Sequence, residues 1–286
     1  MTKMELATVV AEKVGGVVRE VEKANGIIAI GIVKETTGIS PTVYIDPYWH
    51  EGFIDVDEVV EAVKDVFENA IVPDINLDFI KDYFKVKPML RARLYNKATK
   101  AEVFMSAKNA GFDDLIVIPY VVISANAEDG IAAIKVNNWM LEQWNKCDLE
   151  VIADALINSK EEVTRRPFRE TIAELMGIPV DDLPFVVPDM EIISNTSHQF
   201  GAIGILIKLN ELKQRYPNGF TVLPASVHEV LIYPEADASL SSMVGAVNMQ
   251  EVKDVDVLSN NVYVFNELPK ENVDEYMDML KMVYSM

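Results

Sequence analysis

Two apolar, β-branched runs separated by one tight turn place the strongest constraint on the fold of this chain. Residues 115–124 and 131–136 are rich in valine and isoleucine, and Asp129-Gly130 lies between them. Such runs, bounded by turn residues, are typical of neighbouring antiparallel strands. Strand-like runs also lie close together at 27–33 and 42–45. Strands that follow one another directly in sequence favour an α+β fold over alternating βαβ units.

Helical periodicity indicates that helices pack against these strands. Thr2 and Glu5 have the spacing of a capping box, and apolar residues continue at helical intervals to Val21, which predicts a first helix that ends at Asn25-Gly26. In the second half, strands are expected at 190–194, 202–206, 220–223, 228–233 and 262–265. Further helices are predicted over 55–67, 98–110, most of 137–176, 207–216, 240–247 and from Pro269 onward.

Prolines divide the chain. Four of them fall within residues 163–188, a stretch with weak periodicity: Pro167, Pro179, Pro184 and Pro188. We therefore predict an N-terminal α+β part over 1–162, a linker over 163–188 and a C-terminal α+β part over 189–286. The expected fold class is α+β, with mixed or antiparallel sheets packed with helices and two halves joined by a helical, proline-punctuated segment.

Cysteine content and hydropathy indicate a soluble, cytoplasmic protein. Cys147 is the one cysteine, so no internal disulfide can form, and a reducing compartment is expected. No apolar run approaches the roughly 20 residues that span a bilayer, and residues 1–6 lack the layout of a signal peptide. No membrane association is expected.

Charge is distributed unevenly along the chain. The net charge is −19, and residues 171–286 carry 17 acidic and 6 basic side chains. Because contacts with phosphate groups need local positive charge, nucleic-acid binding is not expected. Residues 81–100 have the opposite balance, with Asp82 as the one acid. The bases there are Lys81, Lys85, Lys87, Arg91, Arg93, Lys97 and Lys100. They form either a solvated face or a site for an anion or an acidic partner.

Two small groups are candidate ligand- or partner-binding residues. Arg91 and Arg93 alternate with apolar residues along a predicted strand at 89–95, so they share one face of it. Tyr48, Trp49 and His50 follow a predicted turn at Asp46-Pro47 and would lie at a loop mouth, where amphipathic rings meet ligands. The alternative for these rings is packing over the following helix.

The segment around His228 holds the candidate catalytic residues, which are Ser226, His228 and Glu229. On an extended strand, Ser226 and His228 would share a face about 6.5–7 Å apart, which exceeds hydrogen-bond reach unless Pro224 bends the chain. His228-Glu229 lacks the second histidine of a zincin, and neither a Walker loop nor a dinucleotide-binding glycine pattern is present. We expect no metal and no cofactor.

Several blocks of residues resemble a bacterial family that is known only as domain of unknown function number 5688. They are Ile39–Tyr48, Phe220–Ile232, Ala246–Val252 and Val257–Phe265, and the block from Leu223 to Glu229 is the most specific. The resemblance spans most of the chain and is weakest over 160–188. It implies a cytoplasmic bacterial protein, but it supplies no established activity, cofactor or catalytic residue.

The functional reading therefore depends on missing motifs and segregated charge. The leading hypothesis is a soluble cytoplasmic interaction or ligand-binding protein without catalytic activity, whose partner would be another protein or a small ligand. The alternative is a hydrolase built on Ser226, His228 and Glu229. A third hypothesis is mimicry of nucleic acid by the acidic surface.

Overall fold

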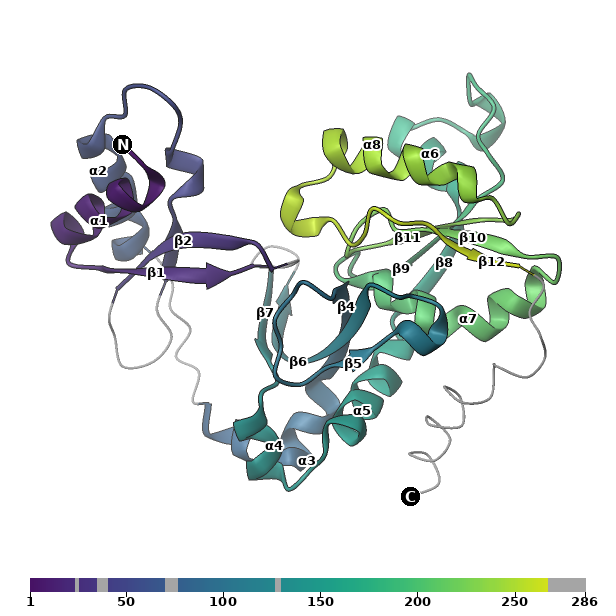
Figure 1. The fold of residues 1–286 in the computed structure, drawn as a ribbon, viewed down its shortest axis with the longest axis horizontal. Coiled ribbons are helices and arrows are strands. Elements are labelled where there is room, and N and C mark those ends of the chain that lie inside the picture. The colour runs from purple at the N-terminus through teal and green to yellow at the C-terminus, as the bar shows by residue number, and fades with distance from the viewer. Residues whose placement is uncertain (24–25, 35–40, 70–76, 127–129, 267–286) are drawn as a thin grey trace. The chain divides into compact units, whose positions relative to one another are not determined.

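The computed structural model describes residues 1–23, 26–34, 41–69, 77–126 and 130–266. Its contacts divide the chain into two units, Met1–Leu77 and Asp78–Met286, and each is described by itself. Three sheets are present, and every pairing between described strands is antiparallel. Helices pack on these sheets (Figure 1), which confirms the predicted α+β class.

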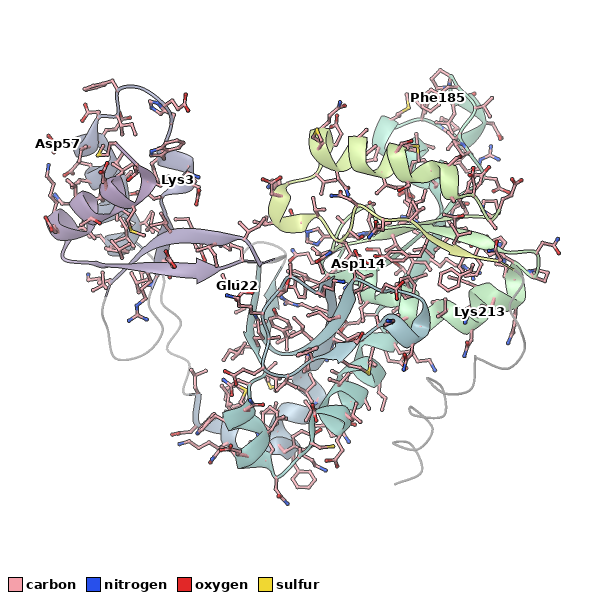
Figure 2. All side chains as sticks on the ribbon, viewed as in Figure 1. Lys3, Glu22, Asp57, Asp114, Phe185 and Lys213 are labelled. Atoms are coloured by element: carbon pink, nitrogen blue, oxygen red, sulfur yellow. The ribbon has the colours of Figure 1, made fainter. Side chains whose placement is uncertain are left out.

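Unit 1 is a three-stranded sheet covered by two helices. The strands have the order β1-β2-β3, and the capped helices α1 and α2 bury their apolar faces against it. Asp55 Oδ1 accepts hydrogen bonds from the amides of Asp57 and Glu58 at the start of α2, which corresponds to the helix predicted over 55–67. Lys13 Nζ lies 2.6 Å from Oδ1 of Asp57, which is labelled in Figure 2, and links the helices. The elements are α1 Lys3–Val14, β1 Val17–Glu22, β2 Ile28–Val33, β3 Thr42–Tyr44, η2 Asp46–Tyr48 and α2 Val56–Asn69.

The first helix ends eleven residues earlier than predicted. Thr2 and Glu5 form the expected capping box, but Gly15 adopts a left-handed conformation (φ 67°) and terminates α1 after Val14. Val17 and Val21 lie on β1, where they pair with Val33 and Ala29 of β2. The predicted extension to Asn25 was therefore wrong, because the spacing of three or four between valines does not separate a helix from a β-branched strand.

The first sheet of unit 2 is built around the long strand β6. β4 pairs with one edge of β6, and β5 and β7 pair with the other edge. This confirms the antiparallel pair that residues 115–136 predict. The elements are η3 Leu77–Lys81, α3 Tyr83–Val86, η4 Lys87–Met89, β4 Leu90–Asn96, β5 Met105–Ser106, η5 Lys108–Ala110, β6 Leu115–Asn126, β7 Gly130–Lys135, α4 Asn138–Trp144 and α5 Asp148–Lys160.

Residues 98–110 do not form the predicted helix. They contain the two-residue strand β5 and the short helix η5, which ends at Gly111 in a left-handed conformation (φ 95°). The segment instead closes the edge of β6, with Met105 opposite Val117. Long-range pairing with β6 outweighs the local helical spacing.

The second sheet of unit 2 has the strand order β12-β10-β11-β9-β8. In Figure 1, α8 and α6 lie on one side of this sheet and α7 lies on the other. The elements are β8 Val163–Pro167, α6 Phe168–Met176, η6 Val180–Asp182, β9 Glu191–Asn195, η7 Gly201–Ile203, α7 Gly204–Arg215, β10 Phe220–Leu223, β11 Val230–Tyr233, η8 Ala238–Leu240, α8 Ser241–Glu251, η9 Asp254–Asp256 and β12 Tyr263–Phe265.

Two predictions in this half differ from the structure. Residues 202–206 are helical, in η7 and the start of α7, and Gly201 and Gly204 let this segment approach β9 closely. A Cβ on Gly204 would lie 2.7 Å from Ile193 Cγ2. His228 precedes β11, which begins at Val230, so it lies in a bend and not on the predicted strand. The helix predicted from Pro269 lies outside the described residues.

The predicted linker contributes to the second sheet. Within 163–188, β8 pairs with β9 from Val163 opposite Asn195 to Pro167 opposite Glu191. Pro167 then precedes α6, whose first residue is Phe168. The boundary between the two units lies between Leu77 and Asp78, well before this proline-rich segment.

Candidate functional site

Arg93 lies on β4 with its guanidinium group against two aromatic rings. Strand pairing places Arg93 opposite Ile118 of β6 and diagonal to Tyr120. The guanidinium carbon is 4.2 Å from the ring centroid of Tyr120 and 3.7 Å from that of Phe200. Arg93 is 8% exposed. Cation–π contacts of desolvated arginine contribute about 2 kcal/mol each, so the rings hold the charged group in place.

The Arg93 guanidinium is held by ring contacts and not by hydrogen bonds to the described residues. Among the residues that the structure describes, no hydrogen bond and no ion pair involves this side chain, although the group carries five N–H donors. Its nitrogen atoms are accessible, since Thr99 Oγ1 is the one fully buried side-chain N or O atom without a hydrogen-bond partner among the described residues. Arg93 is therefore a positive charge that is available to a bound anion.

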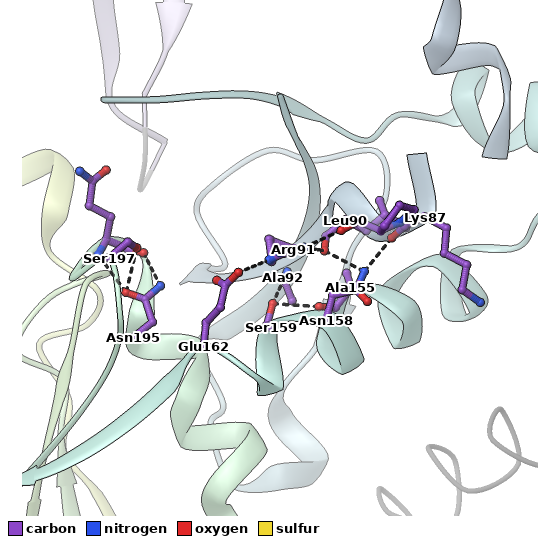
Figure 3. A network of polar contacts seen from close by, with 12 residues as sticks. Lys87, Leu90, Arg91, Ala92, Ala155, Asn158, Ser159, Glu162, Asn195 and Ser197 are labelled. Atoms are coloured by element: carbon purple, nitrogen blue, oxygen red, sulfur yellow. Dashed lines mark hydrogen bonds and ion pairs between the residues drawn. The ribbon is translucent and has the colours of Figure 1, made fainter. Parts of the chain in front are cut away.

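Arg91, on the same face of β4, is paired with a carboxylate. Its Nε donates to Glu162 Oε1 at 2.6 Å, and its Nη1 donates to the carbonyl oxygens of Pro88 and Leu90 at 2.9 and 2.8 Å. Figure 3 shows Glu162 pointing toward Arg91 from the end of α5. The two candidate arginines thus have different environments, and Arg91 is neutralised by its own carboxylate.

Other bases of the predicted basic stretch are paired at the surface. Lys81 and Lys85 form ion pairs with Asp78 and Asp82 three residues earlier, and Lys87 Nζ lies 2.9 Å from Asp154 Oδ1. Exposed pairs of this kind contribute little to stability. Arg91 and Arg93 are the members of this stretch that line a cavity.

A cavity of about 240 Å³ lies beside Arg93 and Arg91. It is lined by β4, by Ser159 and Glu162, and by the segment 195–200, which we call the β9 loop. Apolar side chains such as Val163 and Ile203 form part of its wall. A concave site with one unpaired charge and an apolar wall has the character of a small-molecule binding pocket.

The β9 loop is held in shape by Asn195. The Asn195 Oδ1 atom accepts hydrogen bonds from the amide of Gln199 at 3.0 Å and from Ser197 Oγ at 3.1 Å, and its Nδ2 donates to the carbonyl oxygen of Gln199 at 2.7 Å (Figure 3). His198 and Phe200 both have positive φ, 53° and 58°. Non-glycine residues adopt this conformation where surrounding contacts hold them in it, and such positions cluster at ligand sites.

His228 supports the loop from the neighbouring bend. Its Nδ1 accepts a hydrogen bond from the Phe200 amide at 3.1 Å, its ring lies 5.3 Å from the Phe200 ring, and its Nε2 lies 3.4 Å from Asp256 Oδ1. The carbonyl oxygen of His228 accepts from Ser194 Oγ at 2.9 Å. His228 therefore fixes Phe200, which in turn covers Arg93.

Among the three candidate catalytic residues, Ser226 contacts the backbone of His228 and Glu229 contacts that of Ser226. Ser226 Oγ accepts a hydrogen bond from the backbone amide of His228 at 3.1 Å. Its partner is thus the backbone of His228 and not the imidazole ring. With Nδ1 accepting from Phe200, the ring proton lies on Nε2 toward Asp256, so the imidazole has no free nitrogen to take a proton from Ser226. The backbone carbonyl of Glu229 accepts from the amide of Ser226 and closes the bend.

Replacing His228 tests this support. We expect His228→Ala to lower the free energy of unfolding by about 1–2 kcal/mol, since it leaves the Phe200 amide without its acceptor. His228→Asn retains an acceptor at the position of Nδ1 and should recover about half of that loss. Urea denaturation followed by circular dichroism measures both. Equal losses in the two variants would show that the bond to Phe200 does not stabilise the loop.

Tyr48, Trp49 and His50 lie in unit 1 and are not part of this cavity. Tyr48 and Trp49 are half-buried against the unit 1 core, and Trp49 Nε1 donates to the carbonyl oxygen of Met1 at 3.0 Å. His50 is exposed, with Nδ1 3.2 Å from the carbonyl oxygen of Glu51. These contacts place the two rings on the core of unit 1.

Sequence reasoning singled out Arg93 but missed Tyr120, Phe200, Glu162 and Asn195. The one available signal was the polar run 195–199 followed by Phe200-Gly201. This pattern is typical of a polar loop that ends in an aromatic side chain, which can pack on the protein, and a glycine, which allows close contact between backbones. The described residues contain no group of three or more His, Cys, Asp or Glu side chains placed to hold a metal ion. In the same residues, no helix has the length and apolar character needed to cross a membrane.

Comparison with known proteins gives a family without an assigned activity. A family model described as "Family of unknown function (DUF5688)" matches residues 2–267, which confirms the resemblance seen in the sequence. Neither the curated proteins nor the solved structures contain a match to this chain. The geometry around Arg93 is thus the basis for a functional assignment.

Proposed function

We infer the function of this protein, which belongs to the family of unknown function DUF5688, from its own geometry, and we propose that it binds a small anionic ligand in the cavity beside Arg93. The observation that carries the proposal is a buried guanidinium group that has ring contacts but no acceptor among the described residues. A bound anion would supply the missing acceptor. Arginine is well suited to this role because it stays charged and offers paired donors.

The site is largely preformed, which supports binding. Arg93 is held between the sheet and Phe200, and the β9 loop is fixed by Asn195 and His228. A ligand would therefore meet an ordered cavity and need not fold it, so less conformational entropy would be lost on binding. We propose binding without catalysis, because both nitrogens of His228 are engaged within the protein.

A cytoplasmic location is part of this proposal. The chain has one cysteine, Cys147, and it is free and exposed. An exposed free thiol suits a reducing compartment, where disulfides are rare. The acidic net charge of −19 favours a small ligand over nucleic acid for the anion site.

Replacing Arg93 tests the proposal. We expect inorganic and organic anions at millimolar concentration to raise the Tm of the wild-type protein, and Arg93→Met to weaken the binding of the best anion by about 10- to 100-fold, the equivalent of one charge-assisted pair of hydrogen bonds. Isothermal titration calorimetry measures the affinities. Without ligand, the variant should be at least as stable as the wild type, since methionine removes an unpaired buried charge.

Arg169→Met is the matched control, because Arg169 is exposed on α6 and is not among the cavity residues. It removes the same charge from the same unit, so it should leave anion binding unchanged. Equal affinities in the wild type and Arg93→Met, or the lack of binding by any anion tested, would refute the proposed function.

A further inference from the structure

We propose that the ligand in the Arg93 cavity bears a planar carboxylate, carries one net negative charge and has a small apolar body. This inference rests on the proposed function, because it names the chemical class of the anion that Arg93 would bind. Three independent features of the cavity support it: its net charge, the donors that it offers and the character of its wall.

The charge of the cavity matches a monoanion. Its lining contains three ionised side chains, Arg91, Arg93 and Glu162, and the first and last are joined at 2.6 Å. The net charge of the lining is therefore +1. A second negative charge on the ligand would meet Glu162 without a cation to balance it.

The donors of Arg93 favour a planar acceptor. Ring contacts are made by the guanidinium carbon, and the N–H groups radiate from that carbon in the plane of the group. A carboxylate presents two oxygens in one plane at the spacing of two guanidinium N–H groups, and it forms a pair of parallel hydrogen bonds. This geometry needs no further donor.

Most backbone N–H groups in and after the β9 loop are already hydrogen-bonded, which disfavours a tetrahedral oxyanion. Phosphate sites commonly use several backbone N–H groups directed at the same point. Here the amides of Thr196, His198 and Gln199 donate to the carbonyl oxygens of Glu162 and Asn195 and to Asn195 Oδ1. The amides of Phe200 and Ala202 donate to His228 Nδ1 and to the Val227 carbonyl oxygen. The third and fourth oxygens of a phosphate would find none of these five amides free.

The rest of the cavity fits an uncharged ligand body. Val122, Val163 and Ile203 supply apolar surface, and Phe200 adds an aromatic wall. The side-chain amide of Gln199 also lines the cavity and makes no hydrogen bond among the described residues, so it can accept or donate one bond to a neutral polar group. A volume of about 240 Å³ limits the ligand to a small acid.

Matched pairs of probes test the inference. Acetate, hexanoate and benzoate are compared by calorimetry with methyl phosphate, hexyl phosphate and phenyl phosphate at pH 7.5, where phosphate monoesters are dianions, and benzamide serves as the uncharged analogue of benzoate. We expect the best carboxylate to bind at least tenfold more tightly than its phosphate counterpart, and benzamide to show no binding. Arg93→Lys, which keeps the charge but not the paired donors, should weaken the best carboxylate by at least fivefold.

Glu162→Gln separates charge from shape. It raises the net charge of the lining to +2, so the ratio of phosphate to carboxylate affinity should rise by about tenfold relative to the wild type. Arg169→Met again serves as the control with no expected change. Tighter binding of a phosphate by the wild type, or an unchanged ratio in Glu162→Gln, would overturn the carboxylate assignment while leaving anion binding intact. Failure of all the anions would refute the proposed function itself.

Discussion

Gly201→Ala is expected to destabilise the protein by about 3 kcal/mol, an effect at the upper end for a single added methyl group. A Cβ at Gly201 would lie 2.5 Å from the amide nitrogen of Asn195, 2.6 Å from the carbonyl carbon of Ser194 and 2.7 Å from the carbonyl oxygen of His228. All three are backbone atoms, so none can turn aside as a side chain can. The segment 201–203 must therefore move away from β9.

Chemical denaturation followed by circular dichroism measures this loss, and Gly245→Ala is the control. Gly245 lies within α8, and a Cβ there would have no atom within 4 Å beyond its chain neighbours and the backbone of its own helix, so alanine should stabilise the protein by about 0.5–1 kcal/mol. A free energy of unfolding for Gly201→Ala within 0.5 kcal/mol of the wild type would contradict the close approach. Because Gly201 adjoins Phe200, this variant should also lose anion binding.

Asp114→Ala is expected to destabilise unit 2 by about 3 kcal/mol. Asp114 Oδ2 accepts hydrogen bonds from Ser259 Oγ at 2.7 Å and from Asn261 Nδ2 at 3.0 Å, and its Oδ1 accepts from the Tyr263 hydroxyl at 2.6 Å. Ser259 and Tyr263 are buried. Alanine would leave these donors without their charged acceptor and would release the segment that leads into β12.

The neighbouring carboxylate supplies the control for Asp114. Asp113 is exposed, so Asp113→Ala should change the free energy of unfolding by less than 0.5 kcal/mol in urea denaturation. Burial, and then the bond to Asp114, raise the pKa of the Tyr263 hydroxyl well above its usual range, so this donor stays protonated at neutral pH. Similar losses from Asp113→Ala and Asp114→Ala would show that the cluster of donors is not a stabilising feature.

Local sequence patterns predicted much of the architecture correctly. The antiparallel pair at 115–136 and the helix that follows Asp55 depend on β-branched content, turn residues and a cap, all of which act within a few residues. The predictions failed where distant contacts decided the outcome. Residues 98–110 pair with β6, and residues 202–206 are helical beside β9.

For the candidate site too, local patterns predicted some features and distant contacts decided others. The alternation along 89–95 was sufficient to place Arg91 and Arg93 on one face of a strand, since side chains two residues apart share a face. The sequence by itself therefore determined the α+β class, the capped helices and the shared face of two arginines. Only the tertiary structure decided which arginine is free, because Glu162 reaches Arg91 from 71 residues away and His228 fixes Phe200 over Arg93 from 28 residues away. Contacts between residues so far apart in the chain, and the burial that they produce, create no periodic pattern in the sequence.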